Sequence, residues 1–112
     1  MRIESPTAFL VALDDRVGGI CFSYFDVVGV RIVAVRTLSG ACERIAKTLP
    51  TVVVVPSTLT ADETDLLKDH AAAAGTEVVT LAANLTDVAV RTELARALDR
   101  AKGRREREPK SS

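Results

Sequence analysis

The chain has 112 residues, of which 47% are hydrophobic and 27% charged, as is usual for one globular domain. Its 15 basic and 15 acidic residues give a formal net charge of zero, which argues against nucleic-acid binding because such domains normally carry a basic excess. No apolar run approaches the roughly 18 residues of a membrane-spanning helix, and the start does not resemble a signal peptide. We therefore expect a cytoplasmic protein without membrane attachment.

Four apolar segments predict the strands of a sheet: residues 7–13, 30–35, 51–55 and 77–81. The third contains four consecutive valines between Pro50 and Pro56. β-branched side chains suit strands, and an apolar run without alternation indicates a strand that is buried on both faces. The valine segment therefore predicts a central strand of a parallel sheet.

A segment with helical spacing of apolar residues follows each predicted strand: residues 17–28, 39–49, 60–74 and 86–101. Thr60 and Glu63 form a capping box at the start of the third helix, and Gly75 is placed to end it. Alternating strands and helices predict an α/β fold in which helices cover both faces of a parallel sheet. The expected strand order is 2-1-3-4.

The last residues differ in composition from the rest. Residues 102–112 contain five basic and two acidic side chains, a net charge of +3, together with Gly103 and Pro109. This composition is typical of a frayed helix end followed by a disordered tail. We therefore expect a domain over residues 1–101 and a charged, disordered tail over 102–112.

Three segments resemble the receiver domain of response regulators. Residues 9–15 resemble its first strand and acidic pair, residues 29–35 its second strand, and residues 50–55 its third strand. The resemblance covers residues 7–101 and rests on pattern and order. It implies a flavodoxin-like fold that is truncated, because one βα unit of the family is missing.

The resemblance also implies where the family's chemistry is lost. In receivers, an acidic pair and an aspartate after the third strand hold magnesium, and this aspartate accepts the phosphoryl group. Here Pro56 stands at that position, and the neighbouring Ser57 has no evident base to activate it. Leu81 stands in place of the family's hydroxyl residue, and the lysine of the fifth strand is absent. The chain therefore resembles a pseudo-receiver: no enzyme, but a module that binds a signalling protein independently of aspartyl phosphorylation.

Asp14 and Asp15 are what remains of the metal chemistry. Two adjacent carboxylates after a strand can bind Mg²⁺ weakly through oxygen. The competing interpretation is that Asp15 caps the following helix while Asp14 is solvated. We expect no other cofactor.

The candidate interaction residues are Phe22 and Phe25, which lie off the predicted apolar stripe of their helix, and the strand-end residues Pro56, Ser57 and Leu81. Because a unit is missing, the strand over residues 77–81 is expected to be an uncovered edge. A homodimer, or a partner strand that completes the sheet there, is one hypothesis for assembly.

Two other functions remain open. One is an anti-sigma-antagonist-like module that is phosphorylated on a hydroxyl near the third helix: Ser57, Thr58, Thr60 or Thr64. The other is a small α/β enzyme or ligand-binding domain, for which the sequence offers few convergent polar groups. His70, Cys21 and Cys42 have no neighbours in the sequence that would support catalysis or metal binding.

Overall fold

The computed structural model describes residues 6–107, in which strands and helices alternate. The elements are β1 (Thr7–Val11), α1 (Asp15–Val28), β2 (Arg31–Val35), α2 (Leu38–Thr48), β3 (Val52–Pro56), α3 (Ala61–Ala74), β4 (Glu77–Leu81) and α4 (Asp87–Arg107). Every predicted element is present. The first strand is shorter than expected, because Ala12 has a φ of 52° and turns the chain out of the strand conformation.

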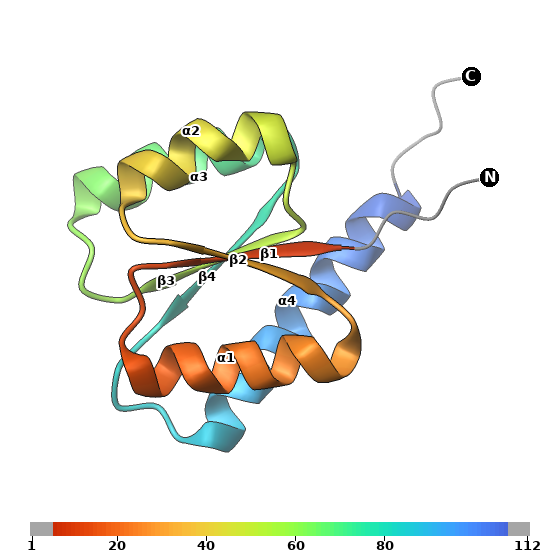
Figure 1. The fold of residues 1–112 in the computed structure, drawn as a ribbon. Helices are drawn as coiled ribbons and strands as arrows, with labels where there is room; N and C mark the ends of the chain where they lie inside the picture. Colours follow the sequence, from red (N-terminus) through yellow and green to blue (C-terminus); the bar gives the residue numbers. More distant parts are fainter. Residues whose placement is uncertain (1–5, 108–112) are drawn as a thin grey trace.

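The four strands form one parallel sheet in the order β2-β1-β3-β4, which confirms the predicted topology. Strands β1 and β3 are central, and β2 and β4 are the two edges (Figure 1). A parallel sheet with helical crossovers places all the carboxyl strand ends at one side of the sheet, where ligands of such folds usually bind.

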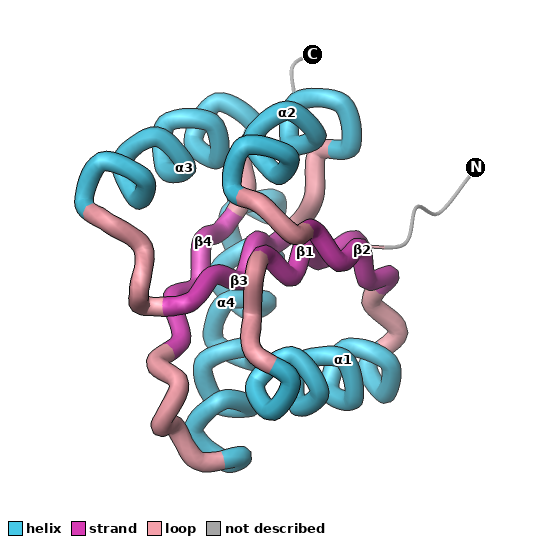
Figure 2. Tube along the Cα trace, turned by 60° about the vertical axis from the view of Figure 1, so that its left-hand side comes forward, coloured by secondary structure: helices cyan, strands magenta, loops and turns pink. Residues whose placement is uncertain are grey.

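Helices cover both faces of the sheet. Helices α1 and α4 pack together on one face, and α2 and α3 pack together on the other (Figures 1 and 2). The valines of β3 alternate between these layers: Val52 and Val54 face α1 and α4, whereas Val53 and Val55 face α2 and α3. All four are almost completely buried, so each contributes on the order of 1.5–3 kcal/mol of hydrophobic stabilisation. This explains the unbroken valine run.

Local signals fix most of the helix ends. Thr60 and Glu63 make the predicted capping box of α3, with both reciprocal hydrogen bonds present. Gly29 and Gly75 follow α1 and α3 in the left-handed conformation, with φ of 80° and 71°, where any other residue would be strained.

Helix α4 is longer than the sequence predicts. It continues to Arg107, so the boundary expected at residue 101 lies inside the helix. Ala101 is buried against the rest of the domain, which ties this part of the helix to the core. Of the predicted disordered tail, residues 108–112 lie outside the described residues.

Candidate functional site

The acidic pair lies at the carboxyl end of β1, in the turn into α1. Asp14 is the N-cap of α1, and its Oδ1 accepts a hydrogen bond from the backbone N–H of Val17 at 2.7 Å. The capping residue is therefore Asp14, and not Asp15 as the competing interpretation had it. Asp15 is exposed in the first helical turn, where its charge complements the helix dipole.

A magnesium ion would need further oxygen ligands near this pair. Among the side chains that the structure describes, in residues 6–103, no three His, Cys, Asp or Glu groups lie close enough together to hold a metal ion. Asp14 already uses one carboxylate oxygen to cap the helix. This donor set does not fit a tightly held divalent ion, and weak magnesium binding stays a prediction.

The strand-end residues beyond β3 and β4 are not equally accessible. Pro56 ends β3 and is half-buried, and Ser57 after it is exposed. The backbone N–H of Ser57 donates to the carbonyl oxygen of Leu81 at 3.0 Å, which joins the two strand ends. The Leu81 side chain is only 1% exposed and lies in the core below α1 and α4, so it offers no surface to a partner.

The two phenylalanines of α1 differ in the same way. Phe22 is 58% exposed, as expected, but the expected exposure of Phe25 is wrong: its side chain is 0% exposed. Phe25 follows Val17 and Cys21 in steps of four residues, and these three form the buried stripe of the helix. A binding role for Phe22 stays a prediction.

The candidate hydroxyls at the start of α3 fall into two groups. Thr60 accepts from Glu63 in the capping box, and Thr64 donates from its hydroxyl to the carbonyl oxygen of Thr60. Ser57 and Thr58 are exposed before the helix. A hydroxyl-directed kinase would therefore find Ser57 and Thr58 more accessible than the two threonines that stabilise the helix start.

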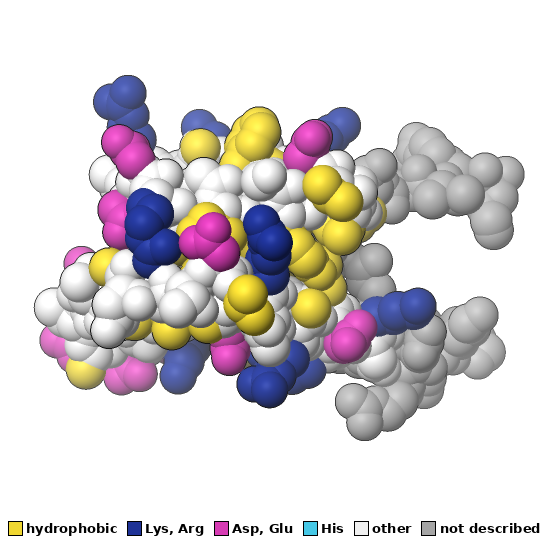
Figure 3. All heavy atoms as spheres, turned by 90° about the horizontal axis from the view of Figure 1, so that it is seen from below, with side chains coloured by type: hydrophobic (Ala, Val, Ile, Leu, Met, Phe, Trp, Pro, Cys, Tyr) yellow, Lys and Arg dark blue, Asp and Glu magenta, His cyan; other side chains and the backbone are white. Residues whose placement is uncertain are grey.

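A groove of about 630 Å³ runs between α1 and the edge strand β2. It brings the predicted residues Asp14, Asp15 and Phe22 together, whereas Pro56, Ser57 and Leu81 are not among its residues. It is lined by Leu10, Ala12, Leu13, Asp14, Asp15, Gly18, Gly19, Phe22, Ile32, Ala34, Val35 and Arg36. Figure 3 looks from the side of α1 and α4 and shows apolar side chains gathered between charged ones. The sequence did not indicate that β2 residues line a groove. The adjacent Gly18 and Gly19 were a signal of open space beside α1, because they have no side chains.

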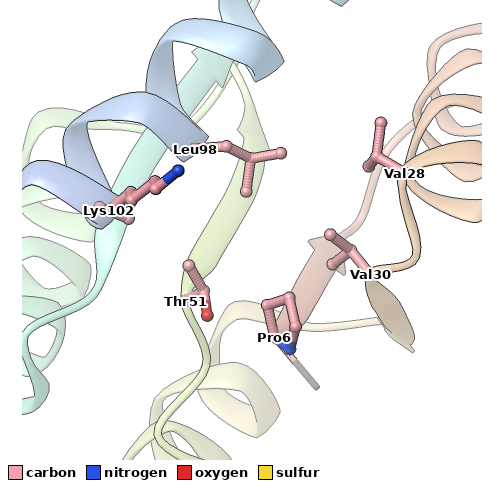
Figure 4. A pocket seen from close by; sticks show the side chains of 7 residues that line it. Pro6, Val28, Val30, Thr51, Leu98 and Lys102 are labelled. Atoms are coloured by element: carbon pink, nitrogen blue, oxygen red, sulfur yellow. The ribbon is translucent and has the colours of Figure 1, made fainter. Parts of the chain in front are cut away.

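A second cavity, of about 290 Å³, lies at the amino ends of the strands (Figure 4). Its walls are mostly apolar, and its polar groups are the hydroxyl of Thr51 and the ammonium group of Lys102. Pro6, Val28, Val30, Leu98 and Ala101 complete the lining. Lys102 lies in the segment predicted as the tail, so this cavity was not predicted from the sequence.

Arg16 joins α1 to the loop between β4 and α4. Its guanidinium donates to the carbonyl oxygens of Ala83, at 2.8 Å, and of Leu85, and it forms an ion pair with Asp87 at 3.4 Å. Arg16 thus satisfies loop carbonyls and fixes the start of α4 beside α1. Arg16 was not predicted as a functional residue, because its partners lie 67 to 71 residues away in the sequence.

Neither cysteine is poised for nucleophilic chemistry. Burial raises the pKa of the Cys21 thiol to about 12, and burial also raises the pKa of Cys42. Because the thiolate is the reactive form, both side chains stay protonated and unreactive near neutral pH. His70 is half-buried, and its Nδ1 lies 3.0 Å from the carbonyl oxygen of Leu66.

Comparison with solved structures places the fold among signal receiver domains. The signal receiver domain of a protein described as a Luxo repressor from Vibrio parahaemolyticus aligns over 95% of this chain and 99% of its own, with a TM-score of 0.69 and 18% sequence identity. NtrX from Brucella abortus, solved in complex with ATP, aligns over 92% of this chain and 28% of its own, with a TM-score of 0.66 and 14% identity.

These identities establish likeness of fold alone. No protein-family model and no curated protein matches the sequence. Within the described part of the chain, no helix is both long and apolar enough to span a membrane.

Proposed function

We propose that this chain is a non-catalytic, cytoplasmic pseudo-receiver that binds another signalling protein and is not switched by aspartyl phosphate. The observation that carries the proposal is the carboxyl end of the central strand β3. Pro56 ends this strand and Ser57 follows, so neither a carboxylate nucleophile nor a metal ligand is present where the receiver resemblance requires the phosphoacceptor.

The acidic pair supports the same proposal. One oxygen of Asp14 caps α1, and no third carboxylate among the described side chains of residues 6–103 lies near enough to complete a metal site. Phosphoryl transfer to an aspartate depends on a divalent ion to neutralise the phosphate oxygens. Because the phosphoacceptor is absent and the ion site is incomplete, we expect the domain to act by binding a partner at its surface.

The groove between α1 and β2 is the surface we assign to the partner. It contains the exposed Phe22, and a half-exposed aromatic side chain beside an apolar cavity is typical of an interface anchor. The partner is a protein; the zero net charge of the chain gives no basis for a nucleic acid.

Self-association through β4 is the second part of the proposal. The N–H of Glu77 and the carbonyl oxygen of Leu81 both bond toward β3. In a parallel strand, alternate residues turn their backbone groups to opposite sides, so those of Val78 and Thr80 face away from the sheet. They can pair with a second copy, and a sedimentation experiment at high protein concentration tests this; a monomer throughout would rule it out.

Amide NMR tests the proposal that the phosphate switch is lost. With magnesium alone, we expect at most small shifts at Asp14 and Asp15 that do not saturate. Adding beryllofluoride, a mimic of an acyl phosphate, should produce no further shift at these residues or at Ser57. Saturable shifts at these residues would replace the proposal with a ligand-gated switch. The variant Asp14→Asn is a suitable control, because asparagine also caps helices but removes the charge.

A further inference from the structure

We propose that the outer edge of β2 and the adjoining groove bind an extended segment of the partner protein, which adds to the sheet as a fifth strand. The segment carries apolar side chains toward the groove and acidic side chains at its ends. This inference rests on the proposed function, because it specifies how the protein partner is held.

The backbone of β2 is arranged for such pairing. The N–H of Arg31 donates to the carbonyl oxygen of Pro6 at 2.8 Å, and the carbonyl oxygen of Val35 accepts from the N–H of Ala12 at 2.9 Å. Residues 31, 33 and 35 thus bond to β1. The N–H and C=O groups of Ile32 and Ala34 therefore point away from the sheet, as a row of donors and acceptors for an added strand.

The groove lies on the same side as the side chains of Ile32 and Ala34. Both residues line it together with Leu10, while Gly18, Gly19 and Phe22 line it from α1. A strand beside β2 turns every second side chain toward this groove. Main-chain bonds to an edge, with an apolar pocket for alternate side chains, are the two components of strand addition.

The charges at the two ends of β2 indicate which kind of segment binds there. Arg31 and Arg36 are exposed at the two ends of β2, and neither forms an ion pair with another described residue. Five residue steps separate them, roughly 17 Å along a strand. They favour a segment with a carboxylate near each end. Asp14 and Asp15 line the groove itself, so the side chains that enter it are apolar rather than acidic.

The same arginines argue against a second copy as the occupant. Two β2 edges paired about a two-fold axis would place Arg31 of one copy at the same end of the ribbon as Arg36 of the other, on opposite faces of the sheet. Two like charges would then repel each other at each end of the ribbon. The edge therefore favours a different chain with acidic ends over self-pairing.

The test uses two synthetic peptides of seven residues, acetylated and amidated, with alternating valine and threonine between two terminal glutamates or two terminal lysines. With the glutamate peptide, we expect saturable amide shifts and slowed hydrogen exchange at Ile32 and Ala34. Binding of the lysine peptide should be at least tenfold weaker. Equal binding of both peptides, or shifts confined to other elements, would overturn the proposal.

Three variants of the full chain separate the components of the site. Gly19→Leu should fill the groove, because a Cβ at Gly19 meets no atom within 4 Å, and should weaken peptide binding at least tenfold. Ala34→Pro removes an outward N–H without touching the bonds to β1, and should weaken binding similarly. Arg31→Glu with Arg36→Glu should reverse the preference in favour of the lysine peptide.

Arg91→Glu is the control for this charge reversal. Arg91 is exposed on α4, away from β2, so changing it from arginine to glutamate should leave peptide binding unchanged.

The outcomes distinguish this inference from the proposed function. No peptide binding at β2, with a flat response to magnesium and beryllofluoride, removes the strand-addition site and leaves the interaction module standing. A saturable beryllofluoride response removes the module proposal itself. If sedimentation shows a dimer that Ala34→Pro dissociates, the occupant is a second copy, and the assignment to an acidic segment is wrong.

Discussion

The two edge strands of the sheet, β2 and β4, have equal length but are covered to different extents by the rest of the chain. In β4, Glu77, Val79 and Leu81 are buried, and the ion pair of Glu77 with Arg100 ties the strand to α4. In β2, only Val35 is buried, an apolar groove runs beside the strand, and an exposed arginine stands at each end. The chain covers one face of β4 itself, whereas β2 keeps an uncovered surface, to which we assign the proposed partner.

The order of the chain explains this difference. Helix α4 follows β4 directly, and Arg16 holds the loop between them against α1, so α4 packs across the β4 half of its face. Helix α1 contacts both α4 and β2. Gly18 and Gly19 give α1 no side chain with which to close the space toward β2.

The largest effect expected of a β2 substitution comes from Val33→Pro. Its N–H lies on the side that bonds to β1, so proline should leave a partner carbonyl unpaired and lower the free energy of unfolding by about 2–3 kcal/mol. Ala34→Pro should cost less than about 1 kcal/mol, because its N–H faces outward. Urea denaturation measures both. Equal losses would show that β2 is paired on both sides and is not an open edge.

A smaller loss is expected at β4 from Arg100→Ala. The Nε of Arg100 donates to Oε1 of Glu77 at 3.0 Å, and the Glu77 side chain is only 9% exposed. Removing a charged partner from a largely buried carboxylate should cost about 2 kcal/mol in thermal or urea unfolding. Adding Glu77→Gln to this variant should recover part of the loss.

The control for this prediction is Arg96→Ala. Arg96 pairs with Glu93 at 3.5 Å on the exposed surface of α4. Such a pair contributes about 0.5 kcal/mol or less. A loss as large as that of Arg100→Ala would mean that helix α4 tolerates truncation poorly in general, and that the Glu77 pair does not specifically secure the β4 edge.

Gly19→Ala should raise stability by about 0.5–1 kcal/mol. Alanine restricts the unfolded chain and favours the helix, and the added Cβ meets nothing within 4 Å. Gly29→Ala is the matched contrast, because Gly29 has a φ of 80° and alanine there should destabilise the protein. A loss of stability for Gly19→Ala would indicate that the space beside β2 is needed by the fold itself.

The fold was predictable because its determinants are local. The valine run of β3, the capping box of Thr60 and Glu63, and the strand–helix alternation each specify an element without knowledge of its neighbours. Right-handed crossovers, together with helices on both faces, then limit the strand order to a few possibilities. The end of α4 at Arg107 lies within the segment predicted as a frayed helix end and tail, because composition does not show at which residue such a helix ends.

The site was only partly predictable because it depends on how elements face one another. Phe25 was misplaced because the side of α1 that packs is set by the sheet beneath it, and the buried stripe is centred on Cys21. Leu81 was misplaced because strand parity puts it on the core side with Val79. The groove arises from the separation of α1 and β2, for which Gly18 and Gly19 gave only an indirect signal.

The smallest change in stability is expected from Phe22→Ser, which tests whether the β2 side is open. Phe22 is 58% exposed, so its loss should alter the free energy of unfolding by no more than about 0.5 kcal/mol. Phe25→Ala, three residues further along α1, should cost about 3–5 kcal/mol because its ring is fully buried. A large loss for Phe22→Ser would show that its ring closes the groove as part of the core. A small loss accompanied by weaker peptide binding would show that the ring serves the partner and not the fold.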